Sequence, residues 1–152
     1  MYKGLVLSTA SFALLFTLTG CPHTTPQSVV GMWNCFSVVQ SCDIIGDEIE
    51  NGDELSGTTV MCTATFRNNG TVRLDYSQGG FLELFYAQIG DNVQISGENF
   101  LLQNGDIWSI RQTTDLQLDD NRHMSGSTTK ILTNSGLSIW ITVCLSDEMV
   151  KF

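Results

Sequence analysis

The amino-acid sequence predicts an all-β domain, an antiparallel meander of about eight strands that closes into a barrel. Apolar and polar residues alternate in short segments, most clearly in Thr58–Arg67 (TTVMCTATFR). Turn sequences separate these segments, of which Asn68-Asn69-Gly70 is a strong hairpin signal. No window keeps an apolar period of 3.6 residues over three turns, so long helices are not expected.

The expected strands follow one another from Val29 onwards. After Thr58–Arg67 they are Thr71–Ser77, Phe81–Gln88, Val93–Ser96, Phe100–Gln103, Asp106–Arg111, Thr113–Leu118, Met124–Leu132 and Leu137–Leu145. Both prolines precede these strands, so every strand residue can donate its ladder hydrogen bond. A meander of this kind must hide its edges, and closure into a barrel achieves this.

The N-terminus predicts export. Lys3 precedes an apolar run with no further charge until Asp43, and the run is shorter than the about 20 residues that span a bilayer. It ends in small residues, as a cleaved signal peptide over residues 1–20 would. Leu18-Thr19-Gly20-Cys21 resembles the lipobox of bacterial lipoprotein precursors, which implies a lipid on Cys21. The alternative is an ordinary signal peptide with Cys21 as a free or paired thiol.

This resemblance also implies a place in a bacterial cell envelope, with the lipid anchor holding the protein at the membrane. Pro22 follows the lipidated position where an inner-membrane retention signal would have Asp, which favours the outer membrane in a cell that has one. Residues 21–28 are expected to be a flexible tether. Residues 29–152 form the predicted barrel domain.

The charge balance excludes one class of partner. Cleavage before Cys21 removes Lys3 and leaves six basic residues against sixteen acidic ones, a formal charge of −10. A surface this acidic repels nucleic acid and anionic lipid headgroups. We therefore expect no nucleic-acid partner.

Four cysteines remain in the mature chain: Cys35, Cys42, Cys62 and Cys144. An even number in an exported protein predicts two disulfides. A zinc site is not expected, because the sequence has no C-x-x-C pair and the domain contains His123 as its single histidine.

Two arguments about the pairing conflict. Face alternation favours Cys35 with Cys62, since Cys35 shares a face with Trp33 and Cys62 with Phe66. A turn centred on Asn51-Gly52 would instead set Cys42 opposite Cys62 and leave Cys35 for Cys144. The second pairing is the one we expect, and it requires a β-bulge within Phe36–Ser41.

Several short motifs carry a further resemblance. They are Gly31-Met32-Trp33, Phe66-x3-Gly70-Thr71-Val72, Gly105-Asp106-x-Trp108-x-Ile110 and Met124-Ser125-Gly126-Ser127. In this order they resemble the small bacterial lipocalin-like domains. The chain departs from them in its four cysteines and in an acidic segment after the first strand. The resemblance implies that Trp33 plugs the closed end of the barrel.

An eight-stranded barrel is either packed solid or hollow enough for one small ligand. We expect a site for a small apolar ligand, lined by Trp33, Phe66, Tyr76 and Trp108. The alternative is that these side chains only fill the core. The acidic segment Asp43–Glu54 could attract a basic protein, and an inhibitor-like module is the second candidate function. It does not fit a calcium loop, because Ile49 falls at a ligand position.

No catalytic constellation is present in the sequence. A Ser-His-Asp arrangement would have to use His123, for which the sequence supplies no defined partner, and no G-x-S-x-G, H-E-x-x-H or phosphate-binding loop occurs. We therefore expect neither enzymatic activity nor a cofactor.

Overall fold

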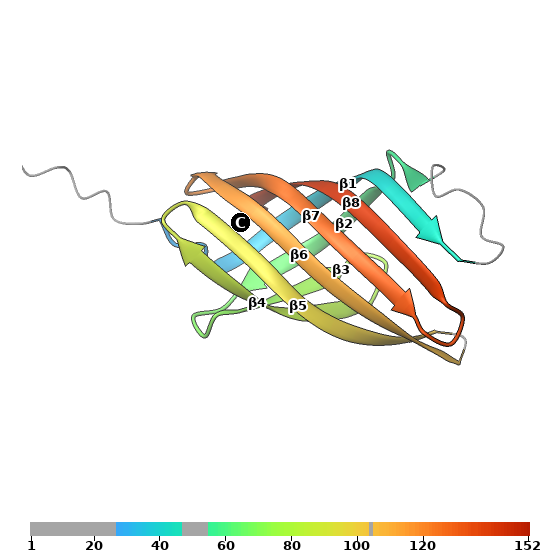
Figure 1. Cartoon of the computed structure of the whole chain (residues 1–152). Coiled ribbons are helices and arrows are strands. Elements are labelled where there is room, and N and C mark those ends of the chain that lie inside the picture. Colours follow the sequence, from blue (N-terminus) through green and yellow to red (C-terminus); the bar gives the residue numbers. More distant parts are fainter. Residues whose placement is uncertain (1–26, 47–54, 104) are drawn as a thin grey trace, which may run out of the picture.

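The computed structural model describes residues 27–46, 55–103 and 105–152 as eight antiparallel strands in one closed barrel (Figure 1). Each strand pairs with its neighbours in the sequence, and β1 pairs with β8 to close the ring. The strands are β1 (Gly31–Ile45), β2 (Thr59–Phe66), β3 (Thr71–Tyr76), β4 (Phe81–Ile89), β5 (Asn92–Gln103), β6 (Asp106–Asp120), β7 (His123–Asn134) and β8 (Ile139–Lys151). The predicted fold class is confirmed.

Two strands each join two segments that the sequence pattern separated. The expected segments Val93–Ser96 and Phe100–Gln103 belong to the single strand β5, and Asp106–Arg111 continues through Thr113–Leu118 as β6. The break was expected around Gly97. In the structure, a Cβ at Gly97 would lie 2.8 Å from Leu84 Cδ2, so the glycine lets a continuous strand pass close to β4.

The Asn69-Gly70 hairpin turn forms as predicted. Gly70 has a φ of 79°, which is open to glycine at little cost. The Asn69 side-chain oxygen accepts hydrogen bonds from the backbone amide of Thr71 at 3.1 Å and from its hydroxyl at 2.7 Å. This turn fixes the register of β2 against β3.

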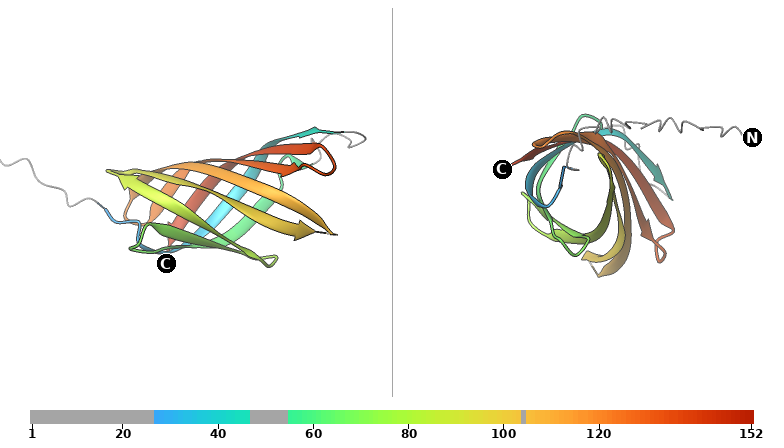
Figure 2. Two further views of the ribbon diagram at one scale, coloured as in Figure 1. Left: turned by 60° about the horizontal axis from the view of Figure 1, so that its bottom comes forward. Right: turned by 90° about the vertical axis from the view of Figure 1, so that its left-hand side faces the viewer.

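The two ends of the barrel differ. The first described residues and the C-terminus lie at the same end, and the end-on view shows the strands closing into a ring (Figure 2). At this end Trp33 is completely buried, and its Nε1 donates a hydrogen bond of 2.7 Å to the Val29 carbonyl oxygen. The Phe66 ring meets the Trp33 ring edge-on, with centroids 6.4 Å apart. We call this the closed end.

The opposite end, which we call the mouth, is uneven. β3 has 6 residues and β4 has 9, whereas β5 has 12 and β6 has 15. The β5–β6 and β7–β8 hairpins therefore extend beyond the short β3–β4 hairpin (Figure 1). One side of the wall is lower than the other at the mouth.

A bulge in β1 changes which residues face the interior. The register of β1 against β8 shifts between Val39 and Ser41. Buried positions fall on odd residue numbers as far as Val39, and Cys42 is then the next buried residue. The bulge lies within the predicted segment Phe36–Ser41, and it places both Cys35 and Cys42 inside the barrel.

Candidate functional site

The interior contains a buried polar layer between the closed end and the mouth. At its centre is Asp147 of β8, of which only 3% is exposed. Ser37 Oγ donates to one carboxylate oxygen and Thr128 Oγ1 to the other, each at 2.5 Å. Burial raises the pKa of the Asp147 carboxyl above its usual range, although these hydrogen bonds partly oppose the shift.

The layer continues across the barrel through further polar side chains. The hydroxyls of Thr114 and Thr128 are 2.6 Å apart, and Gln112 Nε2 donates to Thr114 Oγ1 at 3.1 Å. Gln112 is 4% exposed, and its Oε1 atom has no hydrogen-bond partner among the described residues. These groups come from β1, β6, β7 and β8, so only closure of the barrel brings them together.

Lys130 is the positive group of this layer. It lies directly opposite Gln112 in the β6–β7 ladder, and its Nζ donates a hydrogen bond of 2.9 Å to the Tyr76 hydroxyl. Burial lowers the pKa of Lys130 and raises that of Tyr76. The nearby negative charge of Asp147 favours the protonated form of Lys130 and so limits the shift.

A cavity of about 20 Å³ lies within the polar layer. Its walls include Cys35, Cys62, Gln112, Lys130 and Asp147. A cavity needs about 10–15 Å³ to hold one water molecule, so this space suits water and not a larger ligand.

A larger pocket of about 270 Å³ opens at the mouth, above the short β3–β4 hairpin. We call it the mouth pocket. Its lining is mainly apolar and consists of Tyr76, Gly79, Gly80, Phe81, Leu82, Leu101, Ile110, Lys130 and Leu132. Tyr76 and Lys130 also line the small cavity, so these two side chains form the floor between the apolar pocket and the polar layer.

The four residues predicted to line a ligand site divide between the two ends. Trp33 and Phe66 pack in the main hydrophobic core at the closed end, away from the mouth pocket. Tyr76 lines the pocket. Trp108 is the cross-strand partner of the pocket residue Leu101 but is not itself part of the lining.

Sequence reasoning missed Lys130 and Gln112. The signal for Lys130 was its place in the alternating segment of β7, where Thr128 and Leu132 share its face and point inward. A lysine on the inward face of a strand is unusual, because a buried ammonium must be partnered.

The register of β1 differs from the one that the expected disulfide pairing required. Cys35 lies opposite Cys62 in the β1–β2 ladder, and Cys144 lies opposite Ser41 in the β1–β8 ladder. The expectation that Cys42 faces Cys62 and Cys35 meets Cys144 is therefore wrong about the register. The Asn51-Gly52 turn on which it relied lies outside the described residues.

The four cysteines among the described residues are free thiols in the structure. Cys42 faces the interior, in the small hydrophobic cluster with Val39 and Leu145. Its cross-strand partner is Val143, so the next residue of β8, Cys144, points to the opposite face of the sheet. Among the cysteines that the structure describes, only Cys35 and Cys62 have both the register and the facing suited to a bond. Cys21 lies outside the described residues.

Other candidate chemistry is weaker. Within residues 27–46, 55–103 and 105–152, no three His, Cys, Asp or Glu side chains gather as a metal site would require. His123 is the exposed first residue of β7, with Nδ1 3.6 Å from an Asp120 carboxylate oxygen. In the same described ranges no helix has the length and apolar character needed to cross a membrane.

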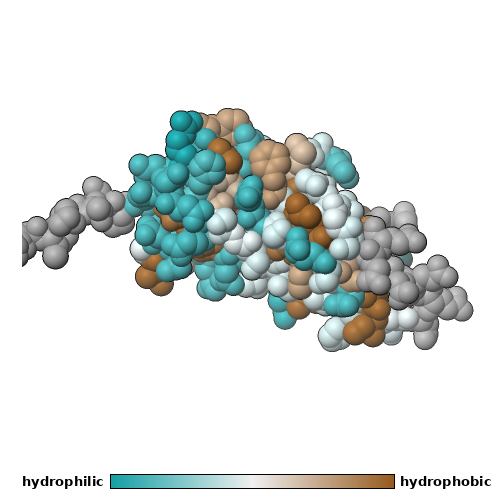
Figure 3. All heavy atoms as spheres, turned by 90° about the horizontal axis from the view of Figure 1, so that it is seen from above, coloured by the Kyte–Doolittle hydropathy of each residue, from teal (hydrophilic) through white to brown (hydrophobic). Residues whose placement is uncertain are grey.

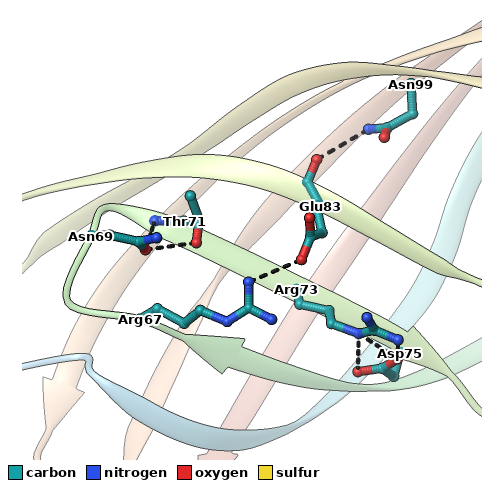
Figure 4. Close-up of polar contacts among 7 residues, drawn as sticks. All are labelled: Arg67, Asn69, Thr71, Arg73, Asp75, Glu83 and Asn99. Carbon is teal, nitrogen blue, oxygen red and sulfur yellow. Dashed lines mark hydrogen bonds and ion pairs between the residues drawn. The ribbon is translucent and has the colours of Figure 1, made fainter.

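The outer face of β2–β4 carries exposed or half-exposed polar pairs (Figure 4). Arg67 contacts Glu83 at 2.9 Å, and Arg73 contacts Asp75 at 2.8 Å. Surface pairs of this kind contribute little to stability, because water screens them. They lie outside the barrel and do not contribute to the mouth pocket.

Exposed apolar side chains are also present on the outer wall. On the face seen from above, hydrophilic residues dominate at the closed end, and hydrophobic ones are more frequent towards the mouth (Figure 3). The outer wall of the mouth-side strand ends bears Ile45, Phe100, Leu102, Ile107 and Trp140.

Comparisons with models of known protein families, with curated proteins and with solved structures found no match. The class of protein defined by the fold is a closed, eight-stranded antiparallel β-barrel with an apolar pocket at one end.

Proposed function

We propose that this protein is a non-enzymatic lipoprotein of the bacterial cell envelope that binds a small apolar ligand in its barrel. The observation that carries the binding proposal is the mouth pocket, a mainly apolar space of about 270 Å³ that opens at one end of the closed barrel. Ligand sites are typically apolar concavities of about 300–1,000 Å³ with a few polar groups. Tyr76 and Lys130 are the polar groups here.

The proposed anchor is a lipid on Cys21, as the resemblance to the lipobox implies. The first described residues lie at the closed end (Figure 1), so the tether joins the domain at the end opposite the mouth. Anchoring at this end would leave the mouth open to a ligand. Labelling cells with a palmitate analogue tests the anchor: we expect label on the native chain and none on Cys21→Ser. Equal label on both would contradict it.

An envelope location also supports one disulfide, between Cys35 and Cys62, because exported proteins meet an oxidising environment. The two residues are direct cross-strand partners. Opposed residues in antiparallel strands have Cα atoms about 4.5–5.5 Å apart, within the range of about 4.4–6.8 Å that a disulfide spans.

Ligand binding is tested by native mass spectrometry of the protein purified from its own envelope. We expect a retained small molecule on the native chain. The variant Ile110→Trp fills the mouth pocket and should lose it, whereas Ile89→Trp, on the exposed outer face of β4, should retain it. Equal retention by the two variants would place the ligand elsewhere, and no retained molecule on any form would count against ligand binding.

The second candidate is a protein-binding module. The observation that favours it is the apolar outer wall near the mouth, since exposed apolar patches often mark interaction sites. The same mass spectra distinguish the two functions. A protein partner that is retained by Ile110→Trp and lost from Trp140→Asp would support this candidate.

A further inference from the structure

We propose that the mouth pocket selects a single-chain amphiphile with a small anionic head group, held by the Lys130 ammonium and the Tyr76 hydroxyl at the floor of the pocket. This inference rests on the proposed ligand binding and names the class of ligand. It is carried by the position of two charges, Lys130 and Asp147, relative to the pocket.

Lys130 faces both spaces, whereas Asp147 lines only the small inner cavity. The Asp147 carboxylate is also occupied, because Ser37 and Thr128 each donate a hydrogen bond to one of its oxygens. An ammonium group has three donors, and Lys130 uses one on the Tyr76 hydroxyl. The charge presented to a ligand at the floor of the pocket is therefore positive.

The walls above this floor are apolar. Leu82, Leu101, Ile110 and Leu132 surround the space between Lys130 and the solvent. A ligand that matches both the apolar walls and the positive floor has an apolar chain along the walls and an acceptor or negative charge at its inner end. The volume of about 270 Å³ lies just below the usual range of ligand pockets, about 300–1,000 Å³, so it suits one chain better than two.

The neutral acceptor Gln112 Oε1 does not compete for this role. Gln112 lines the small cavity below the floor and is not part of the mouth-pocket lining. The acidic outer surface, with a net charge of −9 for the full chain, gives no long-range attraction for an anion. Preference for an anionic head group must therefore come from the local contact with Lys130.

The test uses photoreactive twelve-carbon probes that differ only in the head group: a carboxylate, an alcohol and an amine. Each is added below saturation to the full chain in membranes, and labelled residues are identified by peptide mapping. Because a hydrogen bond to a charged group is worth more than a neutral one, we expect the carboxylate to label β5–β7 about ten-fold more than the alcohol. The amine should label least.

Lys130→Met should reduce the carboxylate preference to about one-fold, and Lys130→Arg should keep it. The matched control is Lys151→Met, because Lys151 lies at the closed end, where its Nζ donates to the Ser28 carbonyl oxygen at 3.0 Å. If Lys130→Met does not fold, the head-group preferences of the native chain and of Lys130→Arg decide whether the inference holds. Equal labelling by acid and alcohol would overturn the inference and leave ligand binding standing. If none of the probes labels the pocket residues, that result would contradict both this inference and the proposed ligand binding.

Discussion

Cys35 of β1 and Cys62 of β2 are direct partners across the β1–β2 ladder, and both side chains line the small cavity beside Lys130. The neighbouring Cys62 thiol lowers the pKa of Cys35, and Cys35 raises that of Cys62. A thiol with a lowered pKa is the better nucleophile in thiol–disulfide exchange.

We therefore predict that oxidised glutathione converts this pair to a disulfide, releasing two molecules of reduced glutathione, and leaves Cys42 and Cys144 unpaired with each other. The bond should stabilise the fold by about 3 to 4 kcal/mol in the chain-entropy model, given the length of the loop it closes. Non-reducing peptide mapping should find a Cys35–Cys62 peptide, and Cys35→Ser should abolish it. A Cys42–Cys62 or Cys35–Cys144 peptide would show that the register of β1 is different.

The second prediction concerns the closed end. Trp33→Ala should lower the free energy of unfolding by about 3 to 5 kcal/mol, because it removes a fully buried aromatic ring and leaves the Val29 carbonyl without its donor. Trp140→Ala is the matched control. Trp140 is 57% exposed, so its loss should change stability by no more than about 0.5 kcal/mol. Chemical denaturation measures both, and equal losses would contradict the plug role of Trp33.

The third prediction concerns Gly126 of β7. A Cβ at this position would collide with the Asp115 carbonyl oxygen and lie 2.9 Å from Leu116 Cα. Both contacts are backbone atoms of β6, which cannot move away as a flexible side chain would. Gly126→Ala should therefore destabilise the barrel towards the upper end of the about 1–3 kcal/mol typical of overpacking. Ser127→Ala, its exposed neighbour, should have little effect, and a Gly126→Ala variant as stable as this control would refute the crowding argument.

The fold was predictable because its determinants are local. Alternation located the strands, although it divided β5 and β6 into two segments each, and Asn69-Gly70 identified its hairpin. A bulge within Phe36–Ser41 was expected because the pairing of Cys35 with Cys144 and Cys42 with Cys62 required one, and a bulge forms there although the register does not support that pairing.

The register and the interior layer were not predictable in the same way. The register of β1 against β2 depends on the whole ladder and on the connection between the two strands. The prediction followed the Asn51-Gly52 turn signal, whereas face alternation correctly placed Cys35 opposite Cys62. Alternation also assigns a residue to a face without giving its height along the barrel. Thr114, Lys130 and Asp147 lie at one level only because the strands are tilted and staggered in the closed ring.

The last prediction follows from the burial of Asp147. Its folded-state pKa is raised above the value of about 3.9 for an unfolded chain, so the folded state binds this proton more tightly. The stability that this tighter proton binding contributes is fully present below the pKa of Asp147 in the unfolded chain. It is lost as the pH rises through the pKa of Asp147 in the folded chain. The charged and titratable groups that share its cavity are Lys130, Cys35, Cys62 and Tyr76. Of these, Lys130 favours the carboxylate and limits the shift.

Asp147→Asn removes this titration while keeping the shape of the side chain. The native chain should therefore lose stability relative to Asp147→Asn as the pH rises from about 4 to about 7, because all other carboxylates titrate alike in the two proteins. Urea midpoints at several pH values in this interval measure the difference. Parallel curves would mean that Asp147 titrates as an exposed carboxylate does, and a native chain that gains on the variant with rising pH would mean that its hydrogen bonds with Ser37 and Thr128 outweigh the cost of burial.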